Sequence, residues 1–185
     1  MTVAASEATA ALRLVEAAVE ERYPGARLPH PLAENPGAPA GLIVRHGEAL
    51  ALIGLDIRGE ASGEWSLFAT SVLSAGGSGI DASLEWVNAR NRRLGVGKYY
   101  SAASREAGVC AIAYDTWIQG AAFAACMRPE PDEAAARLAS VLMALVANVV
   151  DTGAAEARSA AEATGGRTLG DGQTDLQTLL VVALG

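Results

Sequence analysis

Phosphate binding is the first chemistry that the residues of this chain suggest. Residues 95–98 read Gly-Val-Gly-Lys, which resembles the end of a phosphate-binding loop. A Walker loop needs a glycine five residues before its Gly-Lys pair and a hydroxyl residue after the lysine. Arg92 and Tyr99 occupy those positions. We therefore interpret the segment as a glycine helix stop that leads into a strand. Residues 76–79, Gly-Gly-Ser-Gly, are interpreted as a loop rather than as an anion-binding nest, and they lack the Gly-x-Ser-x-Gly spacing of a nucleophile elbow.

Acid–base and metal chemistry have few candidate residues. His30 and His46 are the only histidines, and neither has a cysteine, histidine or carboxylate at ligand spacing beside it. Asp56 and Asp115 are carboxylates that could pair as acid and base, but nothing in the sequence brings them together. The sequence thus predicts no catalytic residue, no metal site and no cofactor, and we expect a protein that is not an enzyme.

Composition narrows the class of protein further. The 185 residues fit one domain, and contents of 51% hydrophobic and 19% charged residues exclude wholesale disorder. A net charge of −7 argues against nucleic acid as a partner, because nucleic-acid binding needs clustered positive charge. Arg90, Arg92 and Arg93 form one small basic cluster. This cluster is either a solvated face or a surface that meets an acidic partner.

The expected location is the cytoplasm. No uncharged apolar stretch is long enough to predict a membrane span, and Met1 to Ala11 lacks the basic region of a signal peptide. Cys110 and Cys126 lie in predicted apolar strands, where buried free thiols in a reducing compartment are favoured over a disulfide. We therefore expect a soluble protein with no membrane partner.

The order of helices and strands predicts an α+β fold. The expected elements are a helix over 6–23, strands over 42–45, 48–58 and 64–73, a helix over 80–94, strands over 98–102, 109–117 and 121–127, and a helix opened by Pro129 and Pro131. Runs of adjacent strands favour an antiparallel sheet with helices packed on it, in the order α-β-β-β-α-β-β-α. We expect one domain over residues 1–153 and a C-terminal extension of uncertain order over 154–185.

Two strand patterns predict details of the sheet. Within 48–58 the apolar residues change from even-numbered to odd-numbered positions near Gly54, which suggests a β-bulge. In strand 109–117 the residues that point to one face and those that point to the other are both largely apolar. Neither face of the sheet is therefore expected to be exposed to water. Helices are expected on one face. The other face needs a cover, which could be a segment of this chain, a second subunit or a bound peptide. The tail over 179–184 could dock or be disordered.

One helix and the strand after it carry a family resemblance. Residues 84–93, Leu-Glu-Trp-Val-Asn-Ala-Arg-Asn-Arg-Arg, are followed by Val-Gly-Lys-Tyr-Tyr at 96–100. Together with the order of elements, this segment resembles the type III secretion chaperone-like family, and within it the YbjN-type branch. In that branch a helix with an apolar-x-x-apolar-Asn-x-x-Asn pattern leads directly into a strand. The resemblance covers roughly residues 3–152.

The resemblance implies a compact α+β domain, often a homodimer, that binds peptide segments of partner proteins and has no catalytic activity. Asn88 and Asn91 match the motif. Because they lie three residues apart, they share a helix face. They either contact a bound chain or satisfy backbone groups that tie the helix to the sheet, and we favour the structural role. Leu84, Val87, Asn91 and Leu94 are expected on one helix face.

Partner contacts are expected from large apolar side chains. Tryptophan is enriched in binding hot spots, although core packing is the ordinary role of any single one. The candidate partner-binding residues are Trp65, Leu67, Trp86, Tyr99 and Trp117. The leading hypothesis is a non-enzymatic, chaperone-like module that holds a segment of a partner protein. The alternative is a small-molecule-sensing or regulatory domain with a pocket between sheet and helices.

Overall fold

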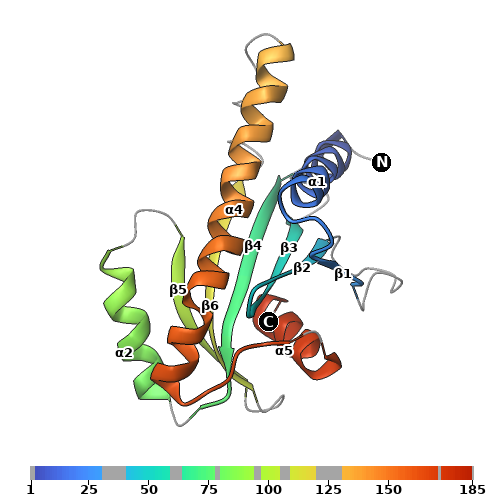
Figure 1. The fold of residues 1–185 in the computed structure, drawn as a ribbon. Coiled ribbons are helices and arrows are strands. Elements are labelled where there is room, and N and C mark those ends of the chain that lie inside the picture. Colours follow the sequence, from blue (N-terminus) through green and yellow to red (C-terminus); the bar gives the residue numbers. More distant parts are fainter. Residues whose placement is uncertain are drawn as a thin grey trace.

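A computed structural model describes residues 3–30, 41–58, 64–77, 80–93, 97–104, 109–119, 131–170 and 172–184. It shows one antiparallel sheet with helices on both faces (Figure 1). The elements are α1 (Val3–Arg22), β1 (Arg27–Leu28), β2 (Gly41–His46), β3 (Ala49–Arg58), β4 (Glu64–Ala75), α2 (Ile80–Asn91), β5 (Lys98–Ser104), β6 (Val109–Gln119), α4 (Pro131–Thr164) and α5 (Gln173–Leu184).

The six strands lie in the order β1-β2-β3-β4-β6-β5, and every neighbouring pair is antiparallel. The predicted α+β class with an antiparallel sheet is therefore confirmed. The order of elements differs from the expectation by the short strand β1 and by helix α5. The strand expected over 121–127 lies outside the described residues.

Strand β3 shows why the apolar residues change from even-numbered to odd-numbered positions. Ile53 and Leu55 contribute to the core beneath α1 and α4, whereas Leu52 contributes to a second core on the opposite face. The pairing of β3 with β2 and β4 is continuous, so the predicted bulge is wrong. The irregularity lies instead in β4, whose register with β6 shifts between Val72 and Ser74. Apolar residues occur at both even and odd positions because both faces of β3 are buried, and not because of a bulge.

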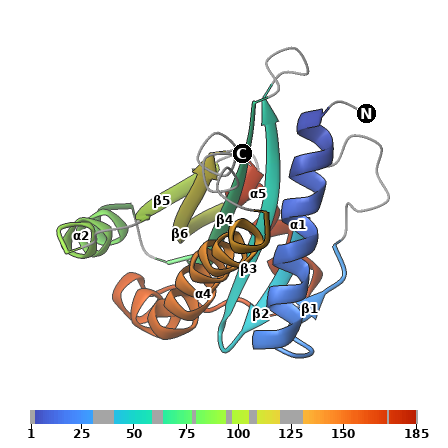
Figure 2. The same ribbon diagram turned by 90° about the horizontal axis from the view of Figure 1, so that it is seen from above.

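Helices α1, α2 and α4 lie on or beside the first face (Figure 2). In α2 the buried residues include Ser83, Trp86 and Val87, and Leu84 is exposed. Leu84 and Val87 were expected to share one helix face, but Val87 is buried and Leu84 is exposed. The buried stripe instead follows the residues that meet β5 and α4.

Helix α4 approaches the sheet closely enough to need a glycine. A Cβ atom on Gly153 would lie 2.1 Å from Ser71 Oγ and 3.3 Å from the Cβ atom of Ala49. The helix continues through this contact to Thr164, so the expected domain boundary at residue 153 falls inside α4. Small side chains in the second half of α4 allow it to lie flat on the strands.

Helix α5 covers part of the second face. Leu179, Leu180 and Val182 are buried there in a core that includes strand residues such as Leu50 and Val72. One of the three expected covers, a segment of this chain, is therefore present. The residues expected as the apolar tail form the second half of this helix.

The connection between α4 and α5 passes around the end of β4. Arg167 and Ala75 exchange two backbone hydrogen bonds of 2.9 Å. Asp175, in the first turn of α5, accepts a hydrogen bond of 2.7 Å from the Gly170 N–H and pairs with Arg167. These bonds fix the point at which the chain crosses from one face of the sheet to the other.

Among the described residues, one helical segment is long and apolar enough to cross a membrane by length and composition. It is Ser140–Thr164 within α4, and 39% of its apolar 18-residue stretch is buried inside the molecule. In this structure the segment packs against β4 and α1 and supplies Leu142, Val146 and Val149 to the core.

Candidate functional site

The structure separates the residues that were expected to contact a partner. Leu67, Trp86 and Tyr99 are buried in the first core. The side chain of Trp65 lies outside the described part of the structure. Trp117 is 53% exposed on the opposite face. A partner on the surface of this structure would reach Trp117 and would not reach the three buried side chains.

The buried aromatic residues join α2 to the sheet and to α4. The ring of Trp86 meets Tyr99 edge-on at 5.3 Å, and Tyr99 lies 4.8 Å from Tyr114. Arg90 stacks on Trp86 at 3.7 Å from the ring centroid and pairs with Glu156 on α4 at 2.9 Å. Arg90 is thus a structural member of this stack, which distinguishes it from the two arginines that follow α2.

Asn91 closes part of the sheet edge. Its Nδ2 donates to the Tyr99 carbonyl at 2.8 Å, and its Oδ1 accepts from the Tyr99 N–H at 2.8 Å. Strand β5 is the last strand of the sheet, so its outer backbone groups have no neighbouring strand among the described residues. The Asn91 amide takes the place of one residue of such a strand and ties α2 to β5. Asn88 is exposed.

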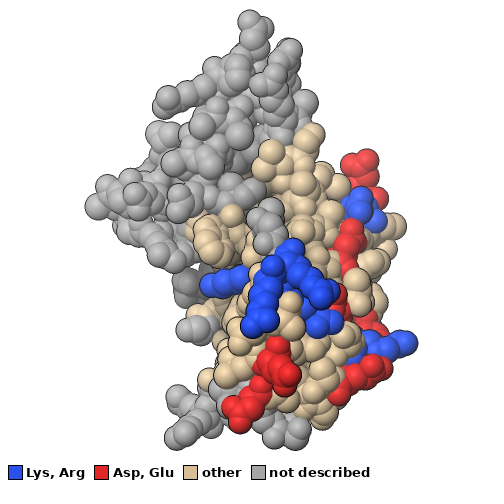
Figure 3. Space-filling model, turned by 90° about the vertical axis from the view of Figure 1, so that its left-hand side faces the viewer, with Lys and Arg blue, Asp and Glu red and all other residues tan. Residues whose placement is uncertain are grey.

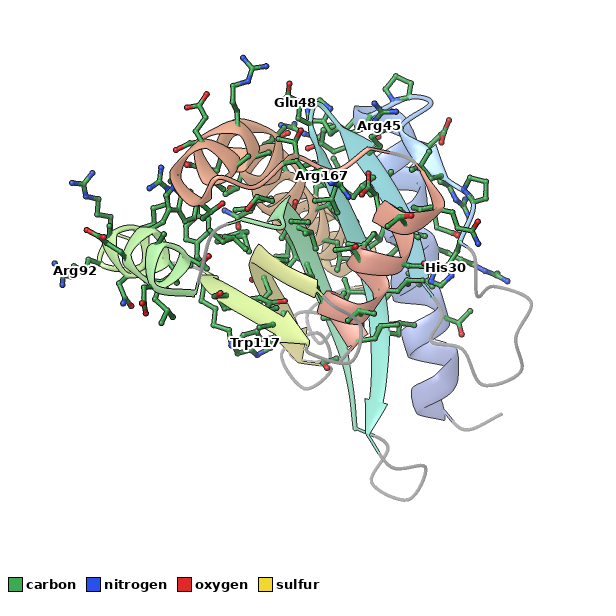
Figure 4. The ribbon with its side chains drawn as sticks, turned by 90° about the horizontal axis from the view of Figure 1, so that it is seen from below. His30, Arg45, Glu48, Arg92, Trp117 and Arg167 are labelled. Atoms are coloured by element: carbon green, nitrogen blue, oxygen red, sulfur yellow. The ribbon has the colours of Figure 1, made fainter. Side chains whose placement is uncertain are left out.

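An aromatic and charged surface lies on the second face beside α5. We call it the Trp117 surface and define it by Phe68, Lys98, Tyr100, Asp115 and Trp117. Cross-strand register brings these residues together, because Phe68 pairs with Trp117 and Lys98 pairs with Asp115. Figure 4 shows Trp117 below the sheet, on the side away from α4.

Lys98 lies between the other members of this surface. Its Nζ is 5.5 Å from the Trp117 ring centroid and 5.8 Å from that of Tyr100. The distance from Nζ to Asp115 Oδ2 is 3.9 Å, which makes a long ion pair. Tyr100 also marks the boundary with α5, since its hydroxyl lies 3.5 Å from the Val182 carbonyl.

Burial shapes the ionisation of this surface. Desolvation raises the pKa of Asp115 above its ordinary value, and the charge of Lys98 opposes part of that rise. Within the described residues, Asp115 Oδ1 is buried without a hydrogen-bond partner. Burial also raises the pKa of Tyr100 to about 12, and the neighbouring Asp115 carboxylate adds to the rise. At neutral pH the tyrosine is therefore a neutral hydrogen-bonding group rather than a base.

The sequence identified Trp117 and Asp115 as separate candidates, but it did not group them with Phe68, Lys98 and Tyr100. The signal that could have found them is the alternation of β5 and β6, which puts Lys98 and Tyr100 on one face and Tyr99 on the other. That signal needs the register between strands, which the sequence does not give. The earlier carboxylate pair is not assembled, because Asp56 on β3 and Asp115 on β6 are separated by β4.

A second charged cluster joins α1 to α4. The Tyr23 hydroxyl donates to Asp151 at 2.7 Å, and Arg22 pairs with the same carboxylate at 2.8 Å. His46 packs on the Tyr23 ring at 5.0 Å. Burial raises the pKa of Tyr23 to about 12, so its hydroxyl stays protonated at neutral pH. No group of three or more metal-ligating side chains occurs in the portion of the chain that the structure describes.

No protein-family model, curated protein or solved structure matches the chain. The function is therefore argued from geometry. The Trp117 surface offers aromatic contact area and one cation on the face of the sheet.

Proposed function

We propose that this protein is a non-enzymatic, chaperone-like module that holds a peptide segment of a partner protein on the Trp117 surface. The observation that carries the proposal is the 53% exposure of Trp117. This residue lies on β6, where it pairs with Phe68 on β4, two residues beyond the described pairing of Asp115 with Lys98 on β5. Tryptophan is highly buried on average in folded proteins, so a tryptophan that is half-exposed on a sheet face marks a candidate contact site.

The surroundings of Trp117 favour contact with another chain. Phe68 is the cross-strand neighbour of Trp117, and Lys98 lies between Trp117 and Tyr100 on the same face. Phe68 and Tyr100 are only partly buried. Large, rigid aromatic side chains supply much of the energy at protein interfaces. Helix α5 covers the adjoining part of the same face. A partner segment would continue the cover that α5 begins.

The outer edge of β5, which has no neighbouring strand among the described residues, supports the same function. Asn91 occupies the outward backbone groups of Tyr99. Because outward groups alternate along an antiparallel strand, those of Ser101 and Ala103 lie further along the same edge. Extended peptides bind to such edges by adding a strand. The resemblance to YbjN-type chaperone-like domains agrees with this mode, and a cytoplasmic homodimer belongs to the same proposal.

The alternative of a small-molecule pocket has no observation in its favour within the described residues. The space between the sheet and helices α1, α2 and α4 is filled by the first core, in which Tyr114, Leu142 and Val146 are fully buried or nearly so. A ligand there would have to displace packed side chains.

Selection from a random library of twelve-residue peptides tests the proposal. We expect wild-type protein to enrich a common pattern that contains apolar residues. Selected peptides should bind Trp117→Ala at least about tenfold more weakly in fluorescence anisotropy, because truncating a hot-spot tryptophan removes about 2 kcal/mol or more.

The matched control is Leu14→Ala, which removes an exposed apolar side chain from α1, and it should bind as wild type does. Failure to enrich any pattern, or equal binding by Trp117→Ala, would contradict peptide binding at this surface.

A further inference from the structure

We infer that a second copy of this chain pairs with the outer edge of β5, which joins two molecules into one sheet with both Trp117 surfaces on the same side. The inference rests on the proposed function for what the joined surface holds, and it adds the identity of the strand that occupies the edge. A two-fold symmetric pair needs a surface that is complementary to itself. The edge of β5 and the exposed face of α2 meet that requirement.

The backbone of β5 offers one symmetric register. Asn91 occupies the outward groups of Tyr99, so Ser101 and Ala103 carry the outward groups of β5 that remain. No strand in the described ranges pairs with this edge, and Ala103 is exposed. An antiparallel copy that uses both residues sets Ser101 opposite Ala103 of the second copy. Ala102 then lies on the two-fold axis, opposite its own copy.

The side chains along this edge allow another strand to approach. Natural sheet edges are commonly protected by charged residues, proline or bulges. Between Tyr100 and Ser104 the strand contains neither a charged residue nor proline, and its pairing with β6 is continuous. Such an edge is a template for pairing.

Helix α2 places an exposed leucine beside the same register. Leu84 is 43% exposed and shares a helix face with Asn91, seven residues later, which is bonded to the edge of β5. The helix runs alongside β5 in the opposite direction (Figure 1). Seven helical residues and the three strand residues from Tyr99 to Ala102 both span about 10 Å. Leu84 therefore lies level with the two-fold axis, where its own copy can cover it.

The charges of α2 are complementary to themselves in this arrangement. Asp81 and Glu85 are exposed in the first half of the helix, and exposed Arg92 and Arg93 follow its last residue. Figure 3, which views this side of the molecule, shows a group of Lys and Arg side chains above a group of acidic ones. A two-fold axis level with Leu84 sets the two α2 helices antiparallel. The acidic start of each helix then faces the basic end of the other, which favours a second copy as the partner.

Pairing in this register also joins the two aromatic surfaces. Antiparallel strands in one sheet are related by an axis perpendicular to the sheet, so the second faces of both copies lie on the same side. Tyr100 and Ala102 pack against the core on that face. Both therefore lie close to the place where the copies meet, and a partner segment that crosses it contacts Tyr100 of each copy.

Disulfide formation across the axis tests the register. In the full chain with Cys110 and Cys126 replaced by alanine, Ala102→Cys should form a linked dimer under mild oxidation. Facing residues at a position without hydrogen bonds between the strands have Cα atoms about 4.5 Å apart, which suits a disulfide. Ala103→Cys is the control, because its two copies would lie diagonally, about 7–8 Å apart, and should form little of the linked dimer.

Sedimentation equilibrium measures the strength of the pairing. Leu84→Asp should raise the dimer dissociation constant at least about tenfold, because the symmetric interface loses the leucine from both copies. Leu14→Asp is the matched control. It changes a leucine that is 38% exposed on α1, which contacts β2, β3 and β4, and it should pair as wild type does.

A charge exchange tests whether the two α2 helices face each other. Asp81→Lys with Glu85→Lys should weaken the pairing at least about fivefold, and Arg92→Glu with Arg93→Glu should do the same, because like charges then meet. An equimolar mixture of the two double variants should pair more tightly than either variant alone.

The outcomes separate this inference from the proposed function. A wild-type chain that sediments as a monomer would overturn the pairing, and so would a dimer that forms equally in Leu84→Asp or links equally through Ala103→Cys. Trp117→Ala should still pair. Peptide binding by a monomeric chain would leave the proposed function intact, whereas a dimer that selects no peptide would overturn the proposed function and leave the pairing.

Discussion

At the scale of single residues, Asp115 is a carboxylate held in an unfavourable place. It is mostly buried, its Oδ1 has no described hydrogen bond, and burial raises its pKa. Because the folded pKa lies above the unfolded one, the folded state holds its proton more tightly. Its contribution to stability is therefore greatest at low pH and is lost as the pH rises through the folded pKa.

We predict that Asp115→Asn stabilises the protein at pH 7 by on the order of 1 kcal/mol, because it removes a poorly solvated charge. The gain should shrink toward pH 4, where the carboxyl group is increasingly protonated. Urea unfolding at both pH values measures it. Glu85→Gln, at an exposed position on α2, serves as the control and should change little at either pH. A lower stability of Asp115→Asn at pH 7 would show that the ion pair with Lys98 outweighs the desolvation.

Asn91 illustrates how one amide can satisfy a sheet edge. We predict that Asn91→Ala lowers the free energy of unfolding by about 1–2 kcal/mol, since two hydrogen bonds to the Tyr99 backbone are lost. It should also promote self-association, because an open strand edge is a template for pairing. Chemical denaturation and sedimentation velocity measure these effects.

Asn88→Ala is the matched control, because Asn88 is an exposed amide on the same helix. If both variants lost the same stability, the loss would reflect the helix in general, and the edge contact would not explain it.

At the scale of elements, α5 is the part of the fold that turns a sheet with one covered face into a sheet with two. Leu179 is fully buried against the second face. We predict that Leu179→Ala lowers the free energy of unfolding by about 2–4 kcal/mol through lost burial and a residual cavity. Thermal and urea unfolding followed by circular dichroism measure the loss.

Leu184→Ala removes the same atoms from the end of the same helix, where the residue is 39% exposed, and should have little effect. A small effect at both positions would mean that α5 adds little to stability and that the second face is covered only loosely.

The helices and strands were also the part of the fold that the sequence predicted best. Periodicity, prolines and glycines placed α1, α2 and the strand hairpins, because local spacing reports local structure. The second face was harder. Leu52 and Ile53 are neighbours in one strand that face different cores, and alternation cannot distinguish two buried faces from a bulge. Helix α5 could not be placed from the sequence. Its apolar residues become part of a core only through contacts with β3 and β4, which the sequence does not specify.

The candidate site was less accessible for a related reason. Trp117 could be named from its residue type, but Trp86 has the same type and lies in the core. What separates the two is the face of the sheet or helix on which each lies. Lys98 joins the site only through pairing with Asp115 across β5 and β6. Such register is a property of the assembled sheet.

At the scale of the whole molecule, every tyrosine reports on packing. The chain has four tyrosines, and all four have a raised pKa. The pKa values of Tyr23, Tyr99 and Tyr100 are each raised to about 12, with burial as the largest cause. These residues lie on different elements and faces, so their ionisation tests whether both cores are intact.

The sign of the pH dependence follows from these shifts. Below pH 10 the tyrosines are protonated in both the folded and the unfolded state, and their ionisation does not affect stability. Above pH 10 the unfolded chain releases protons that the folded chain retains until about pH 12, so stability falls as the pH rises through this window.

We therefore predict that absorbance at 295 nm shows no tyrosine ionising near pH 10 in the folded protein, and that the melting temperature falls steadily between about pH 10 and pH 12. In a denaturant all four tyrosines should titrate near pH 10.

Leu179→Ala would loosen the second core, and Tyr100 packs against that core beside α5. One tyrosine of that variant should then titrate at lower pH than in wild type, while the three in or against the first core stay shifted. A normal titration of several tyrosines in wild-type protein would mean that the two cores are open to water, and that the exposure of Trp117 is one part of a general looseness rather than the mark of a binding surface.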